Sequence, residues 1–135
     1  MDRAFWFAAA AFLLPTFPLG YFWHLKVFRT RYERLETYRP DMIIPFGFAA
    51  MLIQALLYAW LYPRLFSTDP SAWRVNAVHF GALFGFLAWS LAVLPVAAKY
   101  RMRSVSGFMA LETAFTVVHY AIVSPLIALA WRGAT

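Results

Sequence analysis

Residues 107–125 read GFMALETAFTVVHYAIVSP, an apolar stretch that nevertheless carries Glu112 and His119. The apolar run around it extends over residues 104–131, and Glu112 is its single charged residue. About 20 apolar residues are enough for a helix to cross roughly 30 Å of hydrocarbon. The run therefore predicts a transmembrane helix, and the Glu112 carboxyl group has to find a partner inside it.

Three further runs, at residues 4–25, 42–62 and 75–98, contain no charged residue and have a similar length. The composition agrees, because 63% of the chain is hydrophobic and 13% is charged, whereas soluble domains carry about 25% charged residues. Segments such as AMLIQALLYAWL lack the period-two alternation of membrane barrels. We therefore predict one all-α domain, a bundle of four transmembrane helices at about residues 4–25, 42–62, 75–98 and 104–131.

Lysine and arginine are distributed unevenly between the links and ends of these helices. Residues 26–41 and 99–103 together hold eight of the 12, and the opposite side holds the other four. The side richer in these residues is usually cytoplasmic. We therefore expect both termini on the outer, periplasmic side of the membrane. The membrane itself is expected to be a bacterial inner membrane, of the cytoplasmic or the intracytoplasmic kind.

The basic residues also indicate contact with lipid headgroups. Aromatic and charged residues alternate at helical spacing within residues 26–39, which predicts an amphipathic segment along the cytoplasmic membrane surface. Anionic headgroups are a simpler partner than nucleic acid for the net charge of +6. The residues expected to face headgroups are Lys26, Arg29, Arg31, Arg34, Lys99, Arg101 and Arg103.

Small residues recur at four-residue spacing in two of the predicted helices. Close backbone approach matters in lipid, where the hydrophobic effect does not drive helices together. The third helix offers Gly81, Gly85 and Ala88, and the fourth offers Ala110 and Ala114. We expect these two stripes to face one another within the bundle.

Among the polar side chains inside the predicted spans, the candidates for a site are Gln54, Ser90, Glu112 and His119. Glu112 and His119 share one helix face, but two turns separate them by about 10.5 Å, so they need a bridge to interact. One interpretation is functional, as a proton relay, a cation site or a cofactor contact. The other is structural, with Glu112 in an interhelical hydrogen bond to Gln54 or Ser90.

Few features indicate catalysis or a bound group. The chain has no cysteine, and we find no metal-ligand spacing, phosphate loop or nucleophile motif. We predict no metal site, no resident cofactor and no catalytic residue, and we favour a protein that is not an enzyme. Contact with haem or a pigment through His79 and His119 stays open as an alternative.

Three segments resemble a group of small bacterial four-helix membrane proteins known only as a domain of unknown function. They are LGYFWHLKVF at the end of the first helix, GALFGFLAWSLAV in the third, and the pair His119-Tyr120 in the fourth. The similarity extends over about residues 19–129. It implies a four-helix fold and no particular activity.

Two functions fit these observations. The first is a non-catalytic accessory or scaffold subunit of a larger membrane complex, respiratory or photosynthetic, because 14 Phe, seven Tyr and six Trp are too many rings for a small interior. The second is a small proton-coupled transporter or ligand carrier that works as a homodimer through Glu112. The expected partners are lipid and either other membrane subunits or a second copy of the chain.

Overall fold

The computed structural model describes residues 2–134, and the regular structure of this part is entirely helical. Its elements are α1 (Arg3–Phe22), the π-helix η1 (Trp23–Val27), α2 (Arg29–Leu35), α3 (Ile44–Leu65), α4 (Trp73–Lys99) and α5 (Val105–Ala130). With α1 and η1 taken as one rod, four helices are long and apolar enough to cross a membrane. The chain is thus an all-α bundle built for contact with a lipid bilayer.

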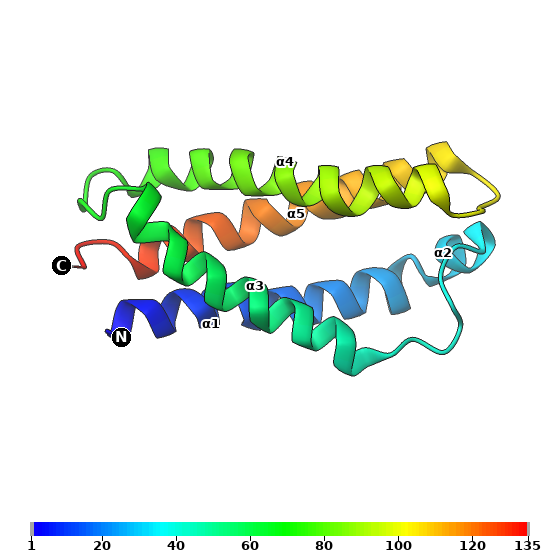
Figure 1. The fold of residues 1–135 in the computed structure, drawn as a ribbon, viewed down its shortest axis with the longest axis horizontal. Coiled ribbons are helices and arrows are strands. Elements are labelled where there is room, and N and C mark those ends of the chain that lie inside the picture. The colour runs from blue at the N-terminus through cyan, green and yellow to red at the C-terminus, as the bar shows by residue number, and fades with distance from the viewer. Residues whose placement is uncertain (1, 135) are drawn as a thin grey trace.

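The four long helices run back and forth, so their links gather at two ends (Figure 1). The terminal end holds both chain termini and the α3–α4 link. The basic end holds η1, α2 and the α4–α5 link at residues 100–104. All seven residues predicted to face headgroups belong to the basic end and are exposed.

Local sequence signals explain where the helices begin. The Asp2 carboxylate accepts from the Phe5 backbone amide at 3.1 Å and caps α1, and the Ser104 hydroxyl accepts from the Gly107 amide at 3.0 Å and caps α5. Both side chains satisfy amides that have no partner within the helix. Pro45 occupies the first turn of α3, where its missing amide hydrogen costs nothing.

The interior divides into two apolar clusters, one towards each end. The larger cluster fills the terminal end and the middle with side chains from α1, α3, α4 and α5, among them the fully buried Phe12, Phe80, Val123 and Ile127. The smaller cluster lies at the basic end and consists of Tyr32, Leu35, Val93 and Phe108 with partly buried neighbours. Since α3 contributes to the first cluster alone, the basic end is held together by η1, α2, α4 and α5.

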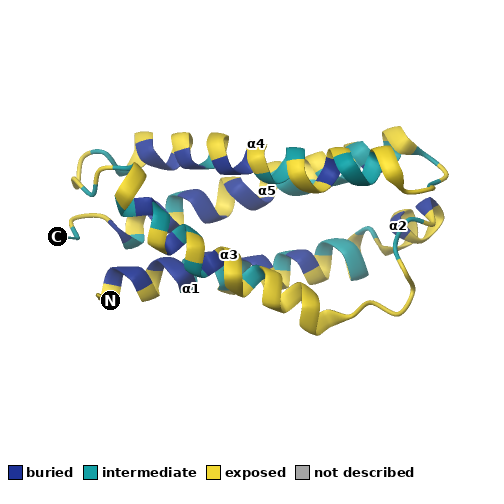
Figure 2. Ribbon diagram, viewed as in Figure 1, coloured by how far each residue is buried: buried dark blue, intermediate teal, exposed yellow. Residues whose placement is uncertain are grey.

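The first half of α3 lies at the edge of the bundle, where the Phe48 ring contacts the Phe17 ring of α1 with centroids 5.9 Å apart. None of residues 44–54 is buried, and this part of the helix is almost entirely exposed in Figure 2. From Ala55 onwards, small and aromatic side chains of α3 pack against α1 and the larger cluster. One face of the first half of α3 is therefore left exposed within residues 2–134.

The predicted pairing of two small-residue stripes is wrong. A Cβ atom on Gly81 would lie 2.8 Å from the Ser124 hydroxyl, and one on Gly85 would lie 3.2 Å from the Tyr120 ring, whereas Ala110 and Ala114 are exposed. The antiparallel course of α4 and α5 explains the difference, since Gly81 lies near the terminal end and Ala110 near the basic end. Ala88 is partly buried against the larger cluster.

We predict that Gly85→Leu destabilises the bundle by about 1–3 kcal/mol relative to Gly47→Leu, the usual cost of overpacking. The new side chain at Gly85 has to displace the Tyr120 ring, whereas a Cβ at Gly47 has no neighbour within 4 Å. Both changes add the same side chain to a helix, so helix propensity cancels. Unfolding in mixed micelles, followed by circular dichroism, measures the difference, and equal stability of the two variants would contradict the packing.

Candidate functional site

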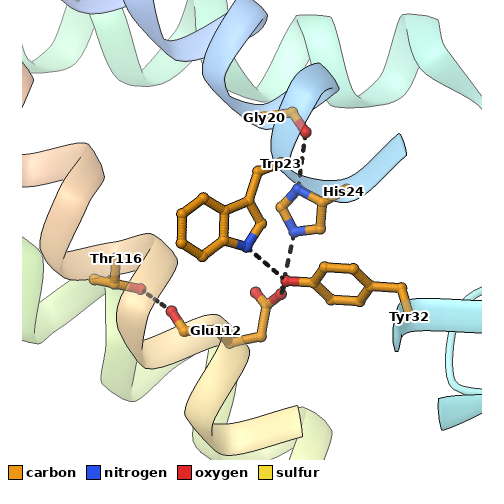
Figure 3. A network of polar contacts seen from close by, with 6 residues as sticks. All are labelled: Gly20, Trp23, His24, Tyr32, Glu112 and Thr116. Carbon is orange, nitrogen blue, oxygen red and sulfur yellow. Dashed lines mark hydrogen bonds and ion pairs between the residues drawn. The ribbon is translucent and has the colours of Figure 1, made fainter. Parts of the chain in front are cut away.

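Glu112 lies inside α5, seven residues after its first residue and therefore about 10 Å along the axis. Its side chain is 13% exposed and points away from lipid towards η1 and α2 (Figure 3). A carboxyl group at this depth is costly unless other polar groups surround it. The network around Glu112 is consequently the candidate functional site.

Two side chains from different elements contact the same oxygen of Glu112. The Tyr32 hydroxyl donates to Oε1 at 2.6 Å, and His24 Nε2 lies 3.1 Å from it (Figure 3). The Trp23 indole donates in turn to the Tyr32 hydroxyl oxygen at 3.1 Å, and His24 Nδ1 lies 2.9 Å from the Gly20 carbonyl oxygen. These contacts tie η1, α2 and α5 together around one carboxyl oxygen.

Trp23 and His24 are the first two residues of the π-helix η1. In η1 the backbone bonds span five residues, as in the bond from the Phe28 amide to the Trp23 carbonyl at 3.1 Å. This wider turn holds an additional residue, so the side chains that follow shift around the helix axis. Single π turns of this kind are frequent at functional sites.

Tyr32 is positioned by the short helix α2, which lies over the end of the bundle. Tyr32 and Leu35 are its buried residues, and the Leu35 carbonyl accepts from the Arg103 backbone amide at 3.0 Å. Burial and, after it, the bond to the Glu112 carboxylate raise the pKa of Tyr32 above its ordinary value. The hydroxyl therefore stays protonated and serves as a donor.

Beside the network a cavity of about 650 Å³ lies between η1, α2 and the following link. Its aromatic wall consists of Tyr21, Tyr32 and Tyr38, and His24 lines the cavity as well. Burial, and then the nearby Glu112, raise the pKa of Tyr38. Charged side chains of both signs complete the lining, namely Lys26, Arg29, Glu33, Glu36 and Arg39. The site thus adjoins a polar space at the basic end.

His119 belongs to a second network in the middle of the bundle. Its Nε2 lies 2.7 Å from the Thr16 hydroxyl, which donates to the Phe12 carbonyl of the same helix. The next residue of α5 is Tyr120, and its hydroxyl lies 2.7 Å from the hydroxyl of Tyr58. The Phe115 ring separates His119 from His24, with centroids 5.5 and 4.9 Å away. The two polar networks are therefore not joined by hydrogen bonds in the described chain.

The predicted hydrogen bond from Glu112 to Gln54 or Ser90 is wrong. Ser90 donates to the Leu87 carbonyl of its own helix at 2.9 Å, and Gln54 is on the exposed half of α3. Sequence reasoning missed Tyr32 and His24 as partners. The available signal was depth, because His24 lies at the end of the predicted span 4–25, on the same side of the membrane as the start of the span that holds Glu112.

The histidines do not gather into a metal site. Within residues 2–134 no group of three or more His, Cys, Asp or Glu side chains is placed to hold a metal ion. His79 is exposed on α4, whereas His119 is buried against α1. The contact of these two residues with haem or a pigment stays a prediction.

Comparisons of this chain with protein-family models, with curated proteins and with solved structures find no match. The four long apolar helices agree with a small four-helix membrane protein, as the resemblance in the sequence implied. Functional proposals therefore rest on the geometry of the chain itself.

We predict that Tyr32→Phe loosens α2, because it removes a donor from Glu112 and leaves the Trp23 indole without its acceptor. A buried polar group without a partner costs about 1–3 kcal/mol, so the amides of Arg29–Leu35 exchange with solvent about tenfold faster or more. Hydrogen exchange in lipid nanodiscs measures this effect. Tyr100→Phe is the matched control, because Tyr100 is exposed at the same end. Equal exchange in both variants would argue against the network.

Proposed function

We propose that this chain is a non-catalytic subunit of a larger membrane complex and that it binds another membrane subunit through the exposed half of α3. The single observation that carries the proposal is the position of Gln54. This residue is ten positions after the first residue of α3 and eleven before its last, so it is at mid-span. It is nevertheless exposed, with no hydrogen bond within residues 2–134.

An exposed amide at this depth favours a protein neighbour over lipid. Lipid tails offer the side chain neither a donor nor an acceptor, and an unpaired amide in hydrocarbon costs several kcal/mol on transfer scales. Transmembrane helices satisfy such groups by hydrogen bonds to one another. The occupant we infer is a transmembrane helix of another subunit that carries a polar side chain at the same depth.

The residues around Gln54 support a helix as that occupant. Gly47, Ala50, Gln54 and Leu57 recur at spacings of three, four and three, and all four are exposed. This is the spacing of a seam between two helices that cross at a small angle. Gly47 and Ala50 permit a close approach at one end of the seam, while Gln54 supplies the hydrogen bond.

We further propose an orientation for the subunit. The basic end holds eight of the 12 lysine and arginine residues, which favours the cytoplasmic side and leaves both termini outside. The host membrane would be a bacterial inner membrane, cytoplasmic or intracytoplasmic.

Site-specific photo-crosslinking in native membranes tests the partner. A photoreactive residue at Ile53, beside Gln54, is expected to give one discrete adduct with a different membrane protein, and Gln54→Leu is expected to abolish that adduct. Val78, which is 69% exposed on α4, is the control position and is expected to give none. A dimer adduct of this chain alone, or an adduct that persists in Gln54→Leu, would contradict the proposal.

A second candidate function is a proton-coupled transporter or ligand carrier that works as a homodimer. The observation that favours it is the cavity of about 650 Å³ beside the Glu112 network. Four helices rarely enclose a path alone, so a second copy would complete it.

For this second function we expect Glu112→Gln to abolish a proton-linked flux in proteoliposomes, because the carrier loses its ionisable group. Asp41→Asn is the matched control, since Asp41 is 75% exposed, pairs with Arg39 at 3.1 Å and does not line the cavity. The control should retain the flux. An unchanged flux in Glu112→Gln would reject the role of Glu112 as the coupling group.

A further inference from the structure

The hydrogen bonds around Glu112 fix where most of the protons in the network lie. A carbonyl oxygen accepts only, so the 2.9 Å contact with Gly20 requires a proton on Nδ1 of His24. An indole nitrogen donates only, so the Tyr32 oxygen accepts from Trp23, and the Tyr32 hydrogen is directed to Glu112. These assignments leave one proton position undecided, namely the one in the 3.1 Å contact between His24 Nε2 and Glu112 Oε1.

This contact requires a proton of its own. With Nδ1 protonated, a neutral imidazole presents a lone pair at Nε2, and a carboxylate presents lone pairs as well. The two atoms attract each other only if a proton lies between them, either on the imidazole or on the carboxyl group. In both cases the pair is neutral overall, which suits its position inside an apolar helix.

We propose that His24 and Glu112 form a binding site for a single proton, and that this proton holds α2 and η1 against α5. When the proton leaves, a carboxylate faces the Nε2 lone pair, so the contact changes from attraction to repulsion. The proton passes from the pair to a base in the adjoining cavity, water or buffer, and no other bond changes. This inference concerns the basic end and does not depend on a partner at α3.

Other titratable groups near the pair do not replace it. Tyr32 from α2 and Tyr38 from the following link face Glu112, and burial raises the pKa of each phenol so that both stay protonated. On α5 the next titratable group, His119, is two turns away behind Phe115. The charged groups of the cavity lie outside the pair, where Arg29 is already bonded to Glu33.

The geometry also identifies a substitution that removes the shared proton. In Glu112→Gln a single amide atom takes the place of Oε1, so it can donate to Nε2 of the neutral His24 ring or accept from Tyr32, but not both. This variant therefore gives up one contact of the network and lacks the proton that can leave. Glu33→Gln changes the charge equally on the exposed face of α2 and serves as the control.

Nitrogen-15 NMR of the protein in nanodiscs of uncharged lipid tests the proposal. The signals to follow are the ring nitrogens of His24 and the indole group of Trp23, assigned with His24→Gln and Trp23→Phe. In the native chain and in Glu33→Gln, we expect both residues to change together in one alkaline step that releases one proton per chain. In Glu112→Gln, we expect His24 to remain a neutral ring with its proton on Nδ1, and Trp23 to remain unchanged over the same range.

Three results would overturn the proposal. They are a native His24 that carries no proton on Nδ1, a Trp23 signal that does not follow the His24 step, and an alkaline step that persists in Glu112→Gln. The first two are measured in the native chain, so they decide the matter even if a variant fails to fold.

Discussion

A carboxyl group within an apolar helix has to be surrounded by polar groups that the protein itself provides, and Glu112 imposes this requirement on the basic end of the bundle. Its oxygen is met by Tyr32 from α2 and by His24 from η1. Both contacts lie where the chain departs from a straight α-helix. Trp23 and His24 open the π turn η1, and the short helix α2 folds back over the bundle end. Removing the carboxyl group would leave these features without the interaction that they share.

The two ends of the molecule are consequently stabilised by different physical means. At the terminal end and in the middle, aromatic rings and small residues of α1, α3, α4 and α5 fill the interior. At the basic end α3 is absent from the core, and a polar network adjoins a cavity between η1, α2 and the following link. Packing in the first region is insensitive to ionisation. The second region contains the contact between His24 and Glu112, so a change of protonation is expected to alter the structure at the basic end.

Much of the fold could be predicted from the sequence, because charge-free runs longer than 20 residues have few alternatives. The four spans, the basic links and the clustering of these links at one end follow from that pattern.

Pairwise contacts could not be predicted in the same way. The spacing of Gly81 and Gly85 indicates a packing face, but it does not identify Tyr120 and Ser124 as the neighbours of that face. Which residues meet depends on the depth of each one along the bundle. Glu112 was recognised as a candidate, but the π turn that begins at Trp23 leaves no recognisable signal in the residues. The exposure of Gln54 depends on the tilt of α3, which its own sequence does not specify.

The central claim is that Glu112 is held by His24 within the same chain. Magic-angle-spinning NMR in lipid bilayers measures this contact directly, through magnetisation transfer between the carboxyl carbon of Glu112 and Nε2 of the His24 ring. We predict a strong cross-peak between these two atoms. A carboxyl carbon that instead correlates with the side-chain amide of Gln54, or that has no contact with His24, would contradict the account.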